Sequence, residues 1–264
     1  MPDLYWLWAA LLAYVAAGGF ALGRGPQRAV LASLVAAIAL HTVALALRWE
    51  RLGHGPFITM FEVLSSNIWS LALVFAVAYW RLPAVRPGAA FVLPILFMMM
   101  GWLLVSNPGE GHLPATYRTA WLYVHVGLGK VFLGAVLVAV GISGVLLARA
   151  LAPARNRFAS LPDDARLERL AFRFAVVGFL FETLMLIAGA IWAQDAWGRY
   201  WAWDPLETWS FTTWLALGFF IHLRATRPLA PHYAALAIVG VFALAFLTFF
   251  GMPFVSTAPH KGAI

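Results

Sequence analysis

Eight apolar runs determine what this chain can fold into. They span roughly residues 4–22, 28–48, 59–80, 89–106, 119–149, 168–193, 208–225 and 233–255. About 20 apolar residues are needed to cross the hydrocarbon core of a bilayer as a helix. Because backbone polar groups in that core must be hydrogen-bonded within the chain, we expect each run to be helical. The sequence therefore predicts an all-α integral membrane protein with eight transmembrane helices in contact with membrane lipid.

The composition supports this class. Hydrophobic residues make up 63% of the 264 residues and charged residues 11%, whereas about a quarter of a soluble domain is charged. No linker separates a second domain, so we expect residues 1–264 to form a single polytopic membrane domain. The first run has no basic residues before it and is expected to be a retained helix. The chain has no cysteine and therefore no thiol chemistry of its own.

The basic residues predict the orientation of the helices, because cytoplasmic loops are enriched in Arg and Lys. When successive connections between the runs are assigned to alternate sides of the membrane, twelve of the 18 basic residues fall on one side and five on the other. The remaining one, Lys130, lies within a run. We expect the side with twelve to be cytoplasmic, which places both termini outside. The net charge of +7 belongs mainly to this inner side. No basic and aromatic pattern typical of nucleic-acid binding is present.

A tryptophan-rich loop, about residues 194–209, lies between the sixth and seventh runs and is expected on the outer face. Four of the 13 tryptophans fall within 13 residues of this loop. One Trp would be an interfacial anchor, but four form an aromatic surface that suits a large planar ligand. The aromatic residues of this surface are Trp197, Tyr200, Trp201, Trp203 and Trp209.

Two acids in this loop have two interpretations. Asp204, Pro205 and Glu207 are typical of a helix start, with an acidic N-cap, Pro at the first position and Glu three residues after the cap. Alternatively, Asp204 and Glu207 orient the aromatic surface or bind the ligand. Before this start, four residues lie at the helical spacing i, i+3, i+4 and i+7, so we expect a short helical turn to align them on one face. They are Trp197, Tyr200, Trp201 and Asp204.

Two histidines are expected beside the aromatic surface. His125 lies near the outer end of the fifth run, and His260 follows the last run on the same side. Two neutral imidazoles beside an aromatic surface suit axial ligation of a haem iron. His222 lies near the inner end of the seventh run and is too far away to share that site. The histidines to which the sequence assigns no role are His41, His54, His112 and His232.

The loop resembles the tryptophan-rich motif of the haem-handling membrane proteins of cytochrome c maturation. The continuation from Asp204 to Glu207 is similar to that of the CcsA (ResC) family and of the much longer CcmF. The length of 264 residues favours CcsA, and the resemblance covers residues 59–260. Leu206 departs from the Lys often found in this motif, and Arg199 is the candidate substitute for contacts to haem propionates.

The resemblance implies export of haem b to the outer face of the bacterial cytoplasmic membrane and covalent attachment to apocytochrome c. The implied partners are CcsB (ResB), with which CcsA forms a holocytochrome c synthase, an apocytochrome with a Cys-x-x-Cys-His segment, and a thiol-reducing protein. His125 and His260 would hold the iron on the periplasmic or exterior side. His222 would serve an inner site with a histidine of the partner.

Two other classes stay open. One is a haem carrier similar to CcmC, which forms no thioether. The other is a membrane subunit without haem, whose tryptophans only anchor it in the interface.

Two ionisable residues lie deep within their runs. Lys130 is 11 residues from the outer end of the fifth run, and Glu182 is 11 residues from the outer end of the sixth. Because an unpaired charge at that depth is costly, we expect the two to form an ion pair. The alternatives are that Lys130 meets a haem propionate and that Glu182 is protonated.

Overall fold

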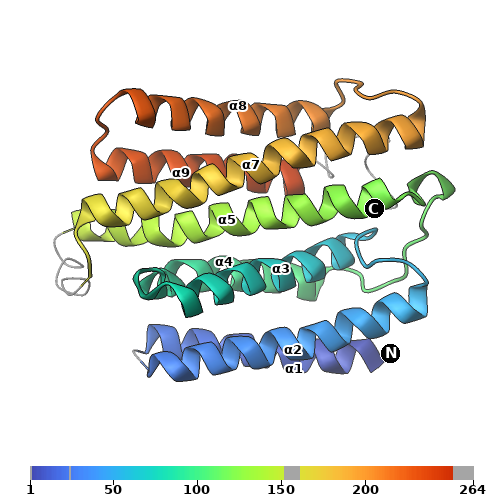
Figure 1. Cartoon of the computed structure of the whole chain (residues 1–264). Coiled ribbons are helices and arrows are strands. Elements are labelled where there is room, and N and C mark those ends of the chain that lie inside the picture. The colour runs from blue at the N-terminus through green and yellow to red at the C-terminus, as the bar shows by residue number, and fades with distance from the viewer. Residues whose placement is uncertain (1, 24, 152–160, 252–264) are drawn as a thin grey trace. The chain divides into compact units, whose positions relative to one another are not determined.

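The computed structural model describes residues 2–23, 25–151 and 161–251, and these ranges are helical without strands. The elements are α1 (Pro2–Leu22), α2 (Gln27–Leu52), α3 (Met60–Arg81), η1 (Pro83–Gly88), α4 (Ala89–Val105), η2 (Ala115–Tyr117), α5 (Ala120–Ala150), α7 (Asp164–Trp197), α8 (Pro205–Thr226), α9 (Pro231–Phe246) and η4 (Leu247–Gly251). Figure 1 shows them along the chain. The all-helical prediction is confirmed for the described residues.

Within the described ranges, seven helical segments are long and apolar enough to cross a membrane. They correspond to α1, α2, α3, α4 with η1, α5, α7, and α9 with η4. The chain is therefore a multi-pass membrane protein. α8 coincides with the seventh predicted run but is not among the seven, because its first turns carry several polar residues. These residues are Glu207, Thr208, Ser210, Thr212 and Thr213. The count of eight spans and their orientation stay predictions.

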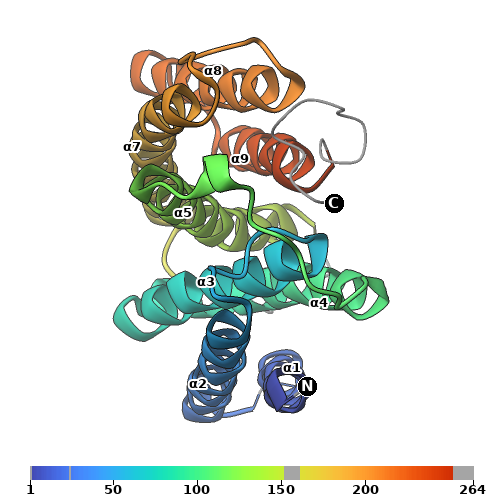
Figure 2. The same ribbon diagram turned by 90° about the vertical axis from the view of Figure 1, so that its right-hand side faces the viewer.

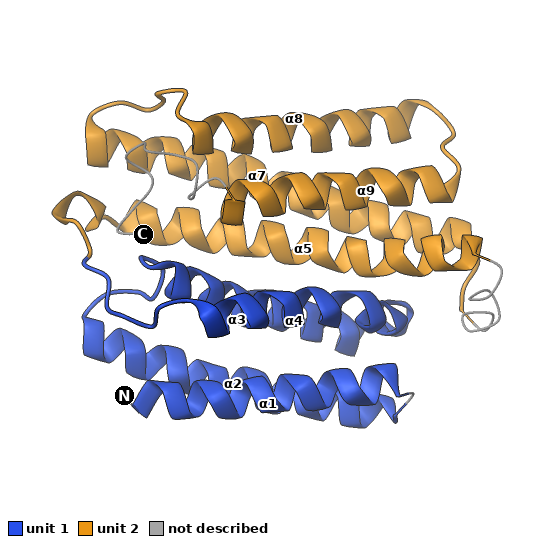
Figure 3. Cartoon of the chain, turned by 180° about the vertical axis from the view of Figure 1, so that it is seen from behind, with its two compact units in different colours: residues 1–112, 263–264 blue, residues 113–262 orange. Residues whose placement is uncertain are grey.

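The chain divides into two compact units between His112 and Leu113 (Figure 3). In the first unit, α1 packs along α2, α2 contacts α3, and α3 contacts α4. In the second unit, α5 packs on α7 and α9, and α8 contacts both α7 and α9. Figure 2 shows these helices of the second unit nearly end-on, as a bundle. The prediction of a single membrane domain is not tested by this division.

The packing of α7 on α5 follows from a buried stripe at helical spacing, and this stripe carries two glycines. A Cβ added at Gly178 would lie 2.7 Å from Cγ2 of Val136, and one at Gly189 would lie 2.7 Å from Nδ1 of His125. Small residues let membrane helices approach closely. The buried members of the stripe are Ala171, Ala175, Gly178, Glu182, Met185 and Trp192.

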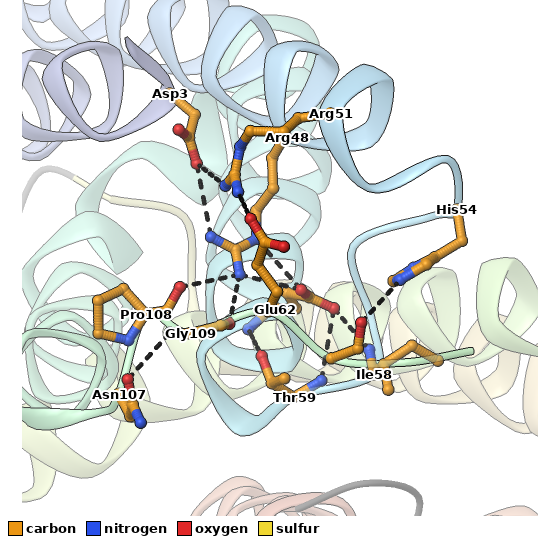
Figure 4. A network of polar contacts seen from close by, with 12 residues as sticks. Asp3, Arg48, Arg51, His54, Ile58, Thr59, Glu62, Asn107, Pro108 and Gly109 are labelled. Carbon is orange, nitrogen blue, oxygen red and sulfur yellow. Dashed lines mark hydrogen bonds and ion pairs between the residues drawn. The ribbon is translucent and has the colours of Figure 1, made fainter. Parts of the chain in front are cut away.

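A buried charge cluster connects α1, α2 and α3 in the first unit (Figure 4). Arg48 is 2% exposed and donates to Glu62 Oε1 at 3.0 Å and Asp3 Oδ2 at 3.4 Å. Its guanidinium also donates to the carbonyls of Pro108 and Gly109, at 3.1 and 2.9 Å. Charges removed from water need such partners. The cluster therefore holds the segment after α4 against the ends of three helices.

Candidate functional site

The tryptophan-rich loop is held at both ends by helix caps. α7 ends at Trp197, where Gly198 has a φ of 73° and donates its N–H to the Gln194 carbonyl at 2.9 Å. α8 begins after Asp204, whose Oδ1 accepts the Glu207 N–H at 2.9 Å. Glu207 Oε2 accepts the Asp204 N–H at 3.4 Å, which completes the predicted capping box.

The expected helical turn across this loop is wrong. Residues 198–204 are not helical, because Gly198 adopts the left-handed conformation that ends α7. Trp197 therefore remains on α7, whereas Trp201 belongs to the irregular segment. Three of the predicted aromatic residues, Trp197, Trp201 and Trp203, therefore fall into two groups with different neighbours.

The first group, which we call the His125 cluster, consists of His125, Tyr117, Trp192 and Trp197. The His125 ring stacks on Trp192 with centroids 5.8 Å apart and an interplanar angle of 23°. Trp192 meets Trp197 edge-on at 5.0 Å and Tyr117 at 5.1 Å. Burial raises the pKa of the Tyr117 phenol, and the Asp204 carboxylate raises it further. Side chains from α5, α7 and η2 thus converge beside the start of α8.

His125 is oriented as a metal-ligating imidazole would be. Its Nδ1 lies 2.9 Å from the Met185 carbonyl oxygen. A carbonyl only accepts, so Nδ1 carries a proton and donates it, and in the neutral ring Nε2 is then the nitrogen that could coordinate a metal. A hydrogen bond from the other ring nitrogen is usual for histidines that bind metals. Gly189 is required here, because a Cβ would lie 2.7 Å from Nδ1.

The second group, which we call the aromatic ladder, consists of Trp201, Trp203, Phe211, Trp214 and Phe179. Phe211 stacks on Trp214 at 5.7 Å and 15°, and Trp214 stacks on Phe179 at 5.4 Å and 19°. Trp201 and Trp203 meet edge-on at 5.6 Å, and each meets Phe211 at 6.2 Å. Sequence reasoning missed Phe179, Phe211 and Trp214, although the i, i+3 spacing of the last two was visible in the apolar run.

Several loop side chains are available to a ligand. Trp203 is 67% exposed and Tyr200 is 61% exposed, and Arg199 is exposed between the two helices. Trp209 is 39% exposed. The indole Nε1 of Trp201 is buried and has no hydrogen-bond acceptor among the described residues. Because a buried donor without an acceptor is costly, this N–H is suited to an acceptor on a bound ligand.

The structure separates His222 from these groups. His222 is exposed and lies 17 residues after Pro205 on α8, about 26 Å along the helix axis at 1.5 Å per residue. It therefore does not share a site with His125. His260 lies outside the described residues, so its predicted role stays a prediction.

Two other histidines have packing roles in the first unit. His41 is buried, with Nε2 2.9 Å from Ser65 Oγ. The ring nitrogens of His54 lie 2.9 Å from the carbonyl oxygen of Gly55 and 3.2 Å from that of Gly111. These contacts explain both residues without a ligand.

The expected ion pair between Lys130 and Glu182 is not formed. Among the described residues no ion pair or hydrogen bond joins them, and both carboxyl oxygens of the buried Glu182 have no hydrogen-bond partner. The contacts of Gly178 with Val136 and of Gly189 with His125 place residues 182 and 130 at similar levels of the two helices. The two residues therefore lie at similar levels of α5 and α7, as expected, but an equal level does not determine the direction of a side chain around a helix.

Comparisons with known proteins agree on one family. A family model described as cytochrome c assembly protein matches residues 4–260. The cytochrome c biogenesis protein CcsA of Synechococcus sp. (strain CC9605) is 29% identical over 253 residues, which cover 83% of this chain and 82% of the relative. CcsA of Prochlorococcus marinus (strain NATL1A) is 30% identical over 239 residues, covering 77% and 75%. CcsA of Solanum lycopersicum is 27% identical over 254 residues, covering 83% and 80%.

A solved structure shares the fold. The chain is similar to a structure of the cytochrome c haem lyase CcmF, with a TM-score of 0.69 and 20% sequence identity. The match covers 94% of this chain and 46% of that chain, so this chain spans about half the length of the CcmF structure.

Proposed function

This chain belongs to the CcsA family of cytochrome c biogenesis proteins, and from that premise we propose that it exports haem b and attaches it to apocytochrome c. CcsB is the proposed partner in this synthase. The observation that carries the proposal is the orientation of His125, whose Nδ1 donates to the Met185 carbonyl and whose Nε2 is the nitrogen able to coordinate iron.

The residues of the second unit fit a haem. In addition to His125, the second unit offers the exposed rings of Trp203 and Tyr200 for a porphyrin face. The buried Trp201 N–H, for which the described part of the chain offers no acceptor, and the exposed Arg199 are candidate donors to haem propionates. His260 is the proposed second iron ligand, on the sequence alone. The remaining proposed contacts are Trp197, Asp204 and Trp209, and Glu207 is proposed to orient the aromatic surface.

The protein would act mainly by positioning. When bound, haem b supplies the vinyl groups to which the two thiols of an apocytochrome Cys-x-x-Cys-His segment add. His125 and the aromatic surface would hold the planar ligand in one orientation, which raises the effective concentration of thiol beside vinyl. This chain contains no cysteine. The thiols therefore come from the substrate, and a separate partner is proposed to keep them reduced.

We place the chain in the bacterial cytoplasmic membrane with eight spans and both termini outside. The 22 residues of α8 correspond to about 33 Å, enough to cross the hydrocarbon core. α8 packs along both α7 and α9, which are candidate spans themselves. The tryptophan-rich loop would then face the periplasm or the cell exterior, and His222, with a histidine of the partner, would serve an inner haem site.

Co-expression tests this proposal against its alternatives. The chain would be produced with CcsB and an apocytochrome c, and haem that stays on the apocytochrome in a denaturing gel would be measured. We expect covalent product from the wild type and none from His125→Ala. Bound haem without covalent product would indicate a carrier similar to CcmC. Absence of both haem and product would favour a membrane subunit whose tryptophans only anchor.

A further inference from the structure

One residue of the tryptophan-rich loop has an unusual backbone. Trp203 has a φ of 59° and is, in the described part of the chain, the one residue other than glycine with a positive φ. The left-handed region crowds the side chain of an L-residue, and a bulky residue stays there only when its surroundings hold it. The Trp203 ring is 67% exposed, so burial of the ring does not provide that restraint.

Hydrogen bonds on both sides of Trp203 provide the restraint. Glu207 Oε2 accepts the N–H of Ala202 at 2.7 Å and the N–H of Asp204 at 3.4 Å. The carbonyl of Trp203 accepts a hydrogen bond from Thr208 Oγ1 at 3.2 Å. One carboxylate oxygen of Glu207 therefore accepts the backbone N–H groups of the residues immediately before and after Trp203. The N–H of Trp203 itself is not among those that it accepts.

A second capping box in the chain shows that this arrangement is not inherent to the motif. At the start of α3, Glu62 Oε2 accepts the N–H groups of Ile58 and Thr59, at 2.9 and 3.4 Å. These are consecutive residues, and the Ile58 side chain is 5% exposed. At α8 the carboxylate instead skips one residue, and that residue is the exposed Trp203.

We propose that Glu207 is a positioning residue, which holds Trp203 in the left-handed conformation and thereby turns its indole outward as part of the haem-binding surface. The role toward haem rests on the proposed function, whereas the backbone restraint does not. Glu207 is 8% exposed and its Oε2 is engaged by the backbone, so it acts through Trp203 and not by touching the ligand.

The restraint is tested without haem. The full chain would be labelled with 5-fluorotryptophan in detergent, and the Trp203 ¹⁹F resonance would be assigned by its loss in Trp203→Phe. We expect Glu207→Gln to keep this resonance, since an amide oxygen still accepts. Glu207→Ala should move it toward the shift of a mobile indole. Asp163→Ala is the matched control, because it removes the cap of α7 and leaves the loop intact. An unchanged Trp203 resonance in Glu207→Ala would overturn the proposal.

A second variant keeps the test decisive if Glu207→Ala does not fold. Thr208→Val removes the hydroxyl that binds the Trp203 carbonyl and leaves Glu207 in place. We expect a smaller displacement of the same resonance in the same direction. No displacement in Thr208→Val would contradict the restraint.

The role toward haem is tested by a double-mutant cycle on haem retained through purification. We expect Trp203→Phe and Glu207→Ala each to lower retention severalfold, and the double variant to fall no further than Trp203→Phe alone. Independent losses that multiply would mean that Glu207 touches the ligand directly, and the positioning role would be wrong. A wild type that retains no haem would count against the proposed function, while the ¹⁹F result would still decide the restraint.

Discussion

Two helices of this chain begin with the same capping box, and the two boxes turn the preceding apolar side chain in opposite directions. At α3, Thr59 and Glu62 cap the helix and Ile58 is 5% exposed. At α8, Asp204 and Glu207 cap the helix and Trp203 is 67% exposed. The difference lies in which N–H groups the glutamate accepts. The same helix-start motif is therefore preceded by a buried side chain, Ile58, in the first unit and by an exposed side chain, Trp203, in the second.

The two glutamates also differ in electrostatic surroundings. Glu62 is fully buried and pairs with Arg48, which also pairs with Asp3 (Figure 4). Glu207 forms no ion pair among the described residues and is stabilised by backbone N–H groups at a helix N-terminus. The α3 box is thus part of a charged cluster whose members depend on one another, whereas the α8 box is local.

The largest expected effect comes from breaking the α3 cluster. Arg48→Ala leaves the buried Glu62 carboxylate without an arginine among the described residues and leaves Asp3 with Arg51 alone. Removing one partner of a buried ion pair costs about 3–5 kcal/mol. Thermal unfolding in detergent should show this loss. Arg51→Ala is the control, because the Arg51 side chain is 26% exposed and should cost clearly less. Equal losses would contradict the central place of Arg48.

Gly189→Ala tests how the second unit orients His125. The new Cβ would lie 2.7 Å from Nδ1 of His125, and such overpacking costs about 1–3 kcal/mol. We expect this variant to lose the haem spectrum as His125→Ala does. Gly127→Ala, on the same helix as His125 but with open space around its Cβ, should keep the spectrum. A normal spectrum in Gly189→Ala would mean that His125 is not held against α7.

Replacing each of the two glutamates by alanine should cost less stability at α8 than at α3. Glu207→Ala removes one local cap, and we expect a loss of stability of about 1 kcal/mol, as for other helix caps. Glu62→Ala also breaks the pair with Arg48 and should cost about 3–5 kcal/mol. Chemical unfolding of both variants in the same detergent measures the difference. Equal costs would show that the two boxes do not differ as described.

The smallest expected effect concerns Glu182, an acid that pairs with no arginine and no backbone N–H group within residues 2–23, 25–151 and 161–251. Both of its carboxyl oxygens lack hydrogen-bond partners in the part of the chain that the structure describes. Replacing a buried unsatisfied polar group by an apolar one of similar volume is neutral or stabilising. We expect Glu182→Met to raise stability by up to about 1 kcal/mol in thermal unfolding. A clear loss would indicate that Glu182 has a partner outside the described residues.

The sequence predicted the elements better than their contacts. The helices, the capping box of α8 and the burial of Glu182 follow from local spacing. The Arg48 cluster was not predicted, because it joins residues up to 61 positions apart in the chain. The helical turn at Trp197 was wrong although Gly198 is a turn signal. The aromatic ladder needed the pairing of α7 with α8, which apolar runs do not specify.

The visible absorption spectrum of the purified protein tests the central claim most directly. The wild type would be compared in mild detergent with His125→Ala and with the control Gly127→Ala. We expect a low-spin bis-histidine haem spectrum in the wild type and the control, and its loss or shift in His125→Ala. The same haem spectrum in all three proteins would contradict His125 as an iron ligand, and with it the proposed site at the tryptophan-rich loop.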